Sequence, residues 1–122
     1  MHHFVGFAGS RNGTVAAAHL VVSSLAAQGA HFLVGYAPGV DASFRSALAR
    51  NKANTTVHCA FRSRKRAAER EGYYALCTTG NTPSPASALH RRTVGMVAAC
   101  THLVLFPVMR TDRQEHPNYA SA

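Results

Sequence analysis

Acidic side chains are scarce in this sequence. The chain has 5 Asp and Glu against 13 Lys and Arg, and its formal net charge is +8 at pH 7. The few acids are scattered, and they form no carboxylate pair of the kind used in acid–base catalysis. Neither a G-x-S-x-G nor an H-E-x-x-H motif occurs. The positive surplus favours anionic partners, which include nucleotides, nucleic acid and acidic surfaces, without choosing among them.

Long apolar runs and export features are also missing. No apolar run reaches the about 18 residues that a membrane span needs. Residues 1–5 lack the basic region, apolar stretch and cleavage site of a signal peptide. We therefore expect a cytoplasmic protein with no membrane partner.

The three cysteines, Cys59, Cys77 and Cys100, lack the C-x-x-C spacing of common metal sites. We expect reduced thiols in or near the core, since free cysteine is usually buried. A zinc site that combines Cys59 with histidines is the alternative, and it has little support in the spacing. No metal ligand is predicted.

What the sequence does contain is an alternation of apolar runs and helix-forming segments. The predicted strands cover residues 3–8, 31–35, 55–61 and 102–107, and the predicted helices cover 15–28, a segment after Asp41, 63–71 and a segment from Ser84. Residues 72–83 are predicted to be a connecting loop. This alternation is typical of a Rossmann-like three-layer α/β/α sandwich with a mainly parallel sheet of about four strands, in the order 3-2-1-4. One domain is expected over residues 1–108, followed by a polar tail over 109–122.

Several residues give the expected helix ends. Thr14 and Asp41 are candidate N-caps, and Ser84 followed by proline is a strong start signal. Gly29 and Gly72 stand where helices end. The helix over 15–28 has no Asp, Glu, Lys or Arg, so at least one of its faces should be covered. We expect a homodimer, and burial within the chain is the competing explanation.

Glycine-rich turns follow the first two predicted strands. Gly9, Ser10 and Arg11 follow the first strand, and Arg11 is the only Lys, Arg, Asp or Glu among residues 1–40. The second turn runs over residues 35–41, with Gly35, Ala37, Gly39 and Asp41, and Arg45 follows it. In parallel sheets ligands bind at the carboxyl ends of strands, where glycines let backbone N–H groups approach an anion. Asp41 is either a helix cap, a contact for a ribose hydroxyl, or both.

The two turns together resemble those of the SLOG superfamily of Rossmann-like domains. That superfamily includes DNA-processing protein A, the LOG-type phosphoribohydrolases and the YspA-type proteins, and the G-S-R turn followed by G-x-A-P-G-x-D is closest to the YspA-type pattern. The resemblance spans roughly residues 4–107. It implies a nucleotide or nucleotide-derived ligand at both turns, with positive charge added from a third segment, Ser87 to Arg92, that includes Arg91.

The sequence also departs from that superfamily. Its members carry a G-G-x-G-T loop after the fourth strand, whereas here Pro107 is followed by Val-Met-Arg-Thr-Asp. The phosphoribohydrolases need a glutamate just past that loop, and Glu115 is not in a matching context. The leading hypothesis is therefore a non-catalytic, sensory or regulatory domain that binds a nucleotide without a further cofactor.

Two alternatives stay open. Single-stranded nucleic-acid binding is suggested by the DNA-processing relatives and by a basic run that contains Arg62, Arg64, Lys65 and Arg66. A phosphoribohydrolase-like enzyme acting on a nucleoside monophosphate is the other.

Overall fold

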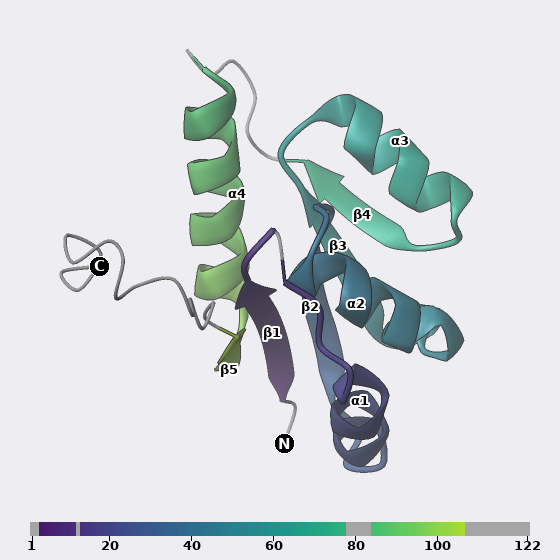
Figure 1. Ribbon diagram of the computed structural model, residues 1–122. Coiled ribbons are helices and arrows are strands. Elements are labelled where there is room, and N and C mark those ends of the chain that lie inside the picture. The colour runs from purple at the N-terminus through teal and green to yellow at the C-terminus, as the bar shows by residue number, and fades with distance from the viewer. Residues whose placement is uncertain (1–2, 12, 78–83, 107–122) are drawn as a thin grey trace, which may run out of the picture.

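Five parallel strands form the sheet of this protein, in the order β4-β3-β2-β1-β5 (Figure 1). The structure is a computed structural model that describes residues 3–11, 13–77 and 84–106. The strands are β1 (Phe4–Gly9), β2 (His31–Gly35), β3 (Thr55–Cys59), β4 (Tyr74–Cys77) and β5 (His102–Phe106). The α-helices are α1 (Ala18–Ala26), α2 (Val40–Ala47), α3 (Arg62–Arg70) and α4 (Pro85–Ala99), and two short 3-10 turns, η1 (Leu48–Arg50) and η2 (Lys52–Asn54), lead into β3. The predicted Rossmann-like α/β class is confirmed.

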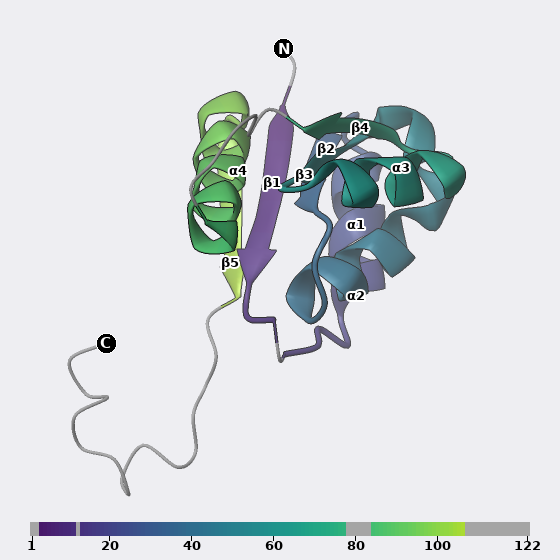
Figure 2. The same cartoon turned by 90° about the horizontal axis from the view of Figure 1, so that it is seen from above.

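The helices cover the two faces of the sheet unequally. Helices α1, α2 and α3 lie on one face, and α4 lies on the other (Figure 2). This follows from the strand order, because β1 to β4 advance in one direction while β5 returns to the other side of β1. Right-handed crossovers then place the last helix on the opposite face. None of the helices in the described part of the chain is both long and apolar enough to cross a bilayer.

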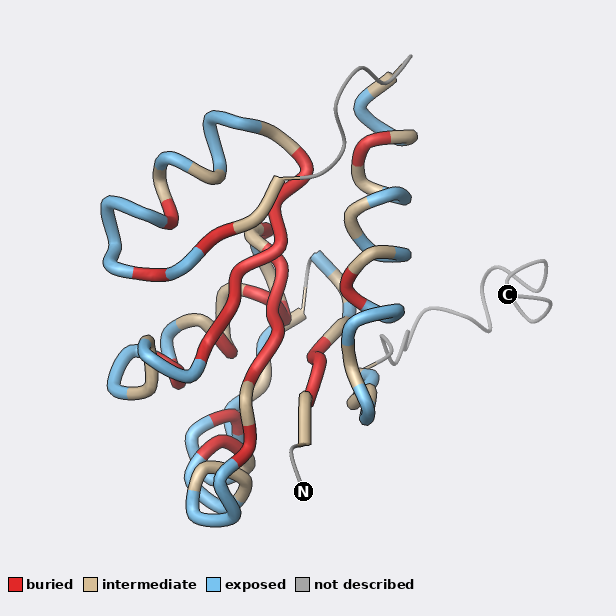
Figure 3. The backbone as a smooth tube through the Cα atoms, turned by 180° about the vertical axis from the view of Figure 1, so that it is seen from behind, coloured by how far each residue is buried: buried red, intermediate tan, exposed pale blue. Residues whose placement is uncertain are grey.

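The main core lies between the sheet and helices α1, α2 and α3, and we call this side of the sheet the three-helix face (Figure 2). Its buried residues run along the central strands (Figure 3). Phe7 of β1 stacks on Phe44 of α2 with ring centroids 4.0 Å apart, and Phe106 of β5 packs against the same ring at 5.1 Å. Val22 of α1 and Ala68 of α3 belong to the same buried cluster. Aromatic burial therefore joins strands and helices that are far apart in the chain.

One strand was not predicted. The expected loop over residues 72–83 is wrong for Tyr74–Cys77, which pair in parallel with β3, while residues 78–83 lie outside the described part. This edge strand is short, and Tyr74 is 64% exposed, so it lacks the apolar run by which the other strands were predicted. The predicted order of the other four strands is confirmed, and β4 extends the sheet beyond β3.

Two predicted helix caps are wrong. Helix α1 begins at Ala18 rather than after Thr14, and the Val15 amide donates instead to the Ser43 hydroxyl at 3.1 Å. Helix α2 has Gly39, not Asp41, at its N-cap. The Asp41 carboxylate accepts from Arg92.

The other predicted helix ends are confirmed. Gly29 and Gly72 have positive φ of 77° and 96°, as expected where helices end. The Ser84 hydroxyl accepts from the Ser87 amide at 3.2 Å, with Pro85 as the first residue of α4.

We predict that Phe44→Ala lowers the free energy of unfolding by about 3–5 kcal/mol, because a fully buried ring is removed from two aromatic neighbours. Chemical denaturation measures the change. Leu20→Ala is the control, since Leu20 is 75% exposed and its loss should cost within about 0.5 kcal/mol. Equal losses in both variants would contradict this assignment of the core.

Candidate functional site

The two glycine turns meet at the carboxyl edge of the sheet. The Val40 amide, at the start of α2, donates to the Ser10 carbonyl at 2.9 Å. Gly39 has φ +82°, and a Cβ on it would lie 2.2 Å from the Ser10 oxygen and 2.4 Å from the Arg11 oxygen. Such distances leave no room for a side chain, so the two backbones touch directly. The structure thus brings together Ser10, Arg11 and Gly39, as the sequence suggested.

Gly9 makes a second close approach at the same edge. A Cβ there would lie 2.7 Å from the Phe106 carbonyl oxygen and 2.7 Å from a methyl carbon of Val40. The end of β1 is therefore enclosed by the end of β5 on one side and by the start of α2 on the other. These contacts give Gly9 a packing role beside any role toward a ligand.

Arg92 of α4 lies over the end of β2. Its Nη1 donates to Asp41 Oδ2 at 3.2 Å, and the two side chains are 12% and 9% exposed. A Cβ on Gly35 would lie 1.5 Å from the same nitrogen, so any side chain at this position would displace the guanidinium from where it lies. Burial raises the pKa of Asp41, and the opposing attraction of Arg92 and Arg45 is the smaller effect.

His58, at the carboxyl end of β3, completes this polar cluster. It is 8% exposed, and burial, with a smaller contribution from the Arg92 charge, lowers its pKa. Within the described residues neither His58 Nε2 nor Arg92 Nε has a hydrogen-bond partner. Buried polar nitrogens normally have partners, so this cluster has unused capacity to bind a polar group.

The remaining predicted residues are placed as follows. Arg45 Nη1 donates to the carbonyls of Gly35 and Ala37, at 3.0 and 2.9 Å, so this arginine stabilises its own turn. Arg11 and Arg91 are exposed. Ser87 serves the cap of α4, where the Ser84 hydroxyl also donates to the Ser87 hydroxyl at 3.1 Å.

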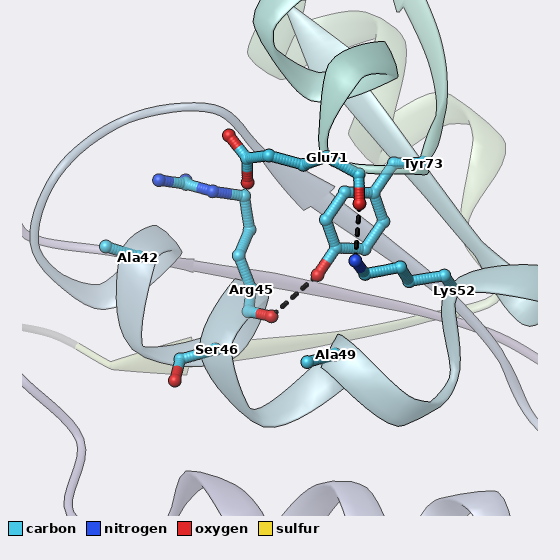
Figure 4. Close-up of a pocket in the computed structure, with 7 residues that line it drawn as sticks. All are labelled: Ala42, Arg45, Ser46, Ala49, Lys52, Glu71 and Tyr73. Atoms are coloured by element: carbon cyan, nitrogen blue, oxygen red, sulfur yellow. Dashed lines mark hydrogen bonds between the residues drawn. The ribbon is translucent and has the colours of Figure 1, made fainter.

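A cavity of about 370 Å³ lies between α2 with its following 3-10 turns and the segment that joins α3 to β4 (Figure 4). The Tyr73 hydroxyl donates to the Arg45 carbonyl at 2.8 Å, and Lys52 donates to the Glu71 carbonyl. The Glu71 carboxylate accepts from the Tyr36 hydroxyl, a bond that raises the pKa of Tyr36. These polar groups fasten α2 to the turn between α3 and β4, so the cavity is a weaker candidate than the carboxyl edge.

Metal binding has little basis in this geometry. Among residues 3–11, 13–77 and 84–106, no three His, Cys, Asp or Glu side chains come together as a group that could hold a metal ion. Cys59, Cys77 and Cys100 are not in disulfides. Cys59 is buried and the other two are partly buried.

Sequence reasoning missed His58 and the Asp41–Arg92 pair. A histidine in the otherwise apolar and β-branched stretch 55–61 is the only signal for the first. The second joins residues 51 positions apart, which no local pattern indicates. Comparisons with protein-family models, with curated proteins and with solved structures found no match to this chain.

We predict that Gly39→Ala destabilises the protein more than Gly29→Ala does. Both glycines have positive φ, and nothing lies within 4 Å of a Cβ at Gly29. The control variant Gly29→Ala should therefore lose only about 1–2 kcal/mol of stability, from the strained backbone alone. Gly39→Ala must in addition push the Ser10–Arg11 backbone away. Thermal and denaturant unfolding of the two variants measure the difference, and equal losses would show that the two turns do not need to touch.

Proposed function

We propose that the carboxyl edge of the sheet binds a small phosphorylated ligand of the nucleotide class. The contact of Gly39 with Ser10 and Arg11 carries this proposal, because it holds two β-to-α turns together at the edge where such sheets bind ligands. The positive end of the α2 dipole adds attraction for an anion at the same place.

The charges around this edge support an anionic ligand. The three acids of the described residues are already engaged: Asp41 with Arg92, Glu69 with Lys65, and Glu71 with the Tyr36 hydroxyl. Arg11 and Arg91 are exposed cations near the turns and on α4. The edge therefore has a surplus of positive charge that a phosphate would neutralise.

Arg92 supplies a donor without losing its ion pair. Its Nη1 serves Asp41, whereas its buried Nε–H has no acceptor among the described residues. A guanidinium has five N–H donors, so a phosphate or ribose oxygen can accept from the remaining ones. The likeness of the two turns to SLOG domains supports a nucleotide as the source of that oxygen.

We propose binding without catalysis, in a sensory or regulatory role. The one carboxylate placed at this edge by the described residues is Asp41, which Arg92 holds. The G-G-x-G-T loop and the following glutamate of the phosphoribohydrolases are missing from the sequence, and Glu115 lies outside the described residues.

Arg11→Ala should weaken nucleotide binding about tenfold or more while the unliganded melting temperature stays near wild type, since a charge-assisted hydrogen bond contributes about 1.5–3 kcal/mol. Thermal shift across mono-, di- and cyclic nucleotides measures this. Arg50→Ala is the matched control, because Arg50 is an exposed arginine in η1. The proposal fails if no nucleotide stabilises the wild type, or if both variants lose affinity equally.

Single-stranded nucleic acid is the second candidate, and one contact favours it. The exposed cations of α3 include Arg62, Arg64 and Arg66. The Arg64 guanidinium lies 5.9 Å from the centre of the Tyr36 ring, which also lies 4.2 Å below Arg45. An aromatic ring therefore lies beside the basic run, although the Arg45 guanidinium already covers it, so a base would have to displace an arginine to stack there.

If α3 binds single strands, the double variant Arg62→Ala/Arg66→Ala should weaken binding and reduce the slope of log K against log salt by about 1.4, at about 0.7 per phosphate. Fluorescence anisotropy of a labelled oligonucleotide over a salt series gives both values. Arg50→Ala serves again as the exposed-arginine control. Salt-independent binding, or an equal effect of the control, would remove this candidate.

A further inference from the structure

Two cysteines are direct neighbours at the carboxyl ends of β3 and β4. Cys59 and Cys77 are register partners in this parallel pair. Adjacent strands lie about 4.8 Å apart, within the range of about 4.4–6.8 Å between Cα atoms that a disulfide allows. Register partners in parallel strands point to the same face, and both thiols belong to the packing of the three-helix face.

The two thiols differ in access. Cys59 is 2% exposed, whereas Cys77 is only partly buried and lines an open groove of about 380 Å³ beside α3. Burial raises the pKa of Cys59 to about 11, with a smaller effect of Cys77, so only a small fraction of Cys59 is thiolate at neutral pH. The thiol that attacks a dissolved disulfide first must be accessible, and that favours Cys77.

The groove beside Cys77 is positively charged. Arg62, Lys65 and Arg66 line it together with Glu69, which pairs with Lys65 at 3.2 Å. Two arginines are therefore left to attract an anion. A small disulfide that carries carboxylates fits this charge better than a cationic one.

We propose that Cys77 is a thiol-modification site for anionic low-molecular-weight disulfides, with Cys59 as its resolving thiol. The Cys77 thiolate attacks one sulfur of glutathione disulfide, and one glutathione thiolate leaves. Cys59 then attacks Cys77 Sγ and displaces the second glutathione, which departs with the Cys59 proton. The two protein thiols are oxidised to one disulfide, and the reagent is reduced to two thiols. This step does not depend on the nucleotide proposal.

Intact mass and peptide mapping after exposure to glutathione disulfide test the proposal. Wild type should lose two hydrogens and yield a Cys59–Cys77 peptide pair. Cys59→Ala should instead hold one glutathionyl group on Cys77. Cys77→Ala should form neither the protein disulfide nor the mixed disulfide. Cys100→Ala is the matched control and should behave as wild type, because Cys100 is a partly buried thiol that donates to the Val97 carbonyl and packs beside Gly6.

The groove charge is tested in Cys59→Ala, where the mixed disulfide accumulates. Glutathione disulfide should modify this protein several-fold faster than cystamine, and adding Arg62→Gln and Arg66→Gln should reduce that ratio. Melting curves of the reduced variants confirm that each is folded before it is assayed. Modification of Cys100 as fast as Cys77, a mixed disulfide that persists on wild-type Cys77, or a ratio unchanged by the arginine substitutions would overturn the proposal.

Discussion

The backbone contact between Gly39 and the Ser10–Arg11 segment determines much of what lies around it. It exists because a parallel sheet brings the ends of β1 and β2 to one edge, and because only a residue without a Cβ fits at 2.2 Å from the Ser10 oxygen. The contact also uses the first amide of α2, since Val40 N–H donates to Ser10. The two turns are thereby held in place by the protein itself, so little ordering remains for a ligand to impose.

The Asp41–Arg92 pair connects this edge to the other face of the sheet. Arg92 belongs to α4, so the pair fastens the single helix on that face to the β2–α2 turn. A buried ion pair gains little net stability after desolvation, and the raised pKa of Asp41 reflects that cost. The pair instead fixes the position of the guanidinium, which is held over Gly35 with its Nε buried.

Much of the fold could be predicted from local patterns, and the failures have a physical cause. Apolar runs identify four of the five strands, including the edge strand β5, whereas β4 has only four residues and is defined by pairing with β3. Thr14 and Asp41 have the right residue types for caps. Neither residue caps its helix, because tertiary contacts compete. The Val15 amide donates to the Ser43 hydroxyl, and the Asp41 carboxylate accepts from Arg92.

The candidate site also has features that the sequence shows and features that only the fold creates. The glycine turns are visible in the sequence because close backbone approach demands glycine locally. Arg92 is indicated by the sequence only through the resemblance, and neither its pairing with Asp41 nor the buried position of His58 is visible locally, because both depend on long-range packing. Tyr36 likewise comes near the basic run only through the fold, where Arg64 of α3 lies over its ring.

The two faces of the sheet differ in the side chains that pack against them. The three-helix face holds the stacked rings of Phe7 and Phe44 and most of the buried apolar residues. The α4 face has glycines at close approaches: a Cβ on Gly6 would lie 3.4 Å from Cys100 Sγ, and Gly35 lies under Arg92. This separation explains how a domain of this size can keep under-satisfied polar groups such as His58 at its edge, because the apolar packing that stabilises the fold lies on the other side of the sheet.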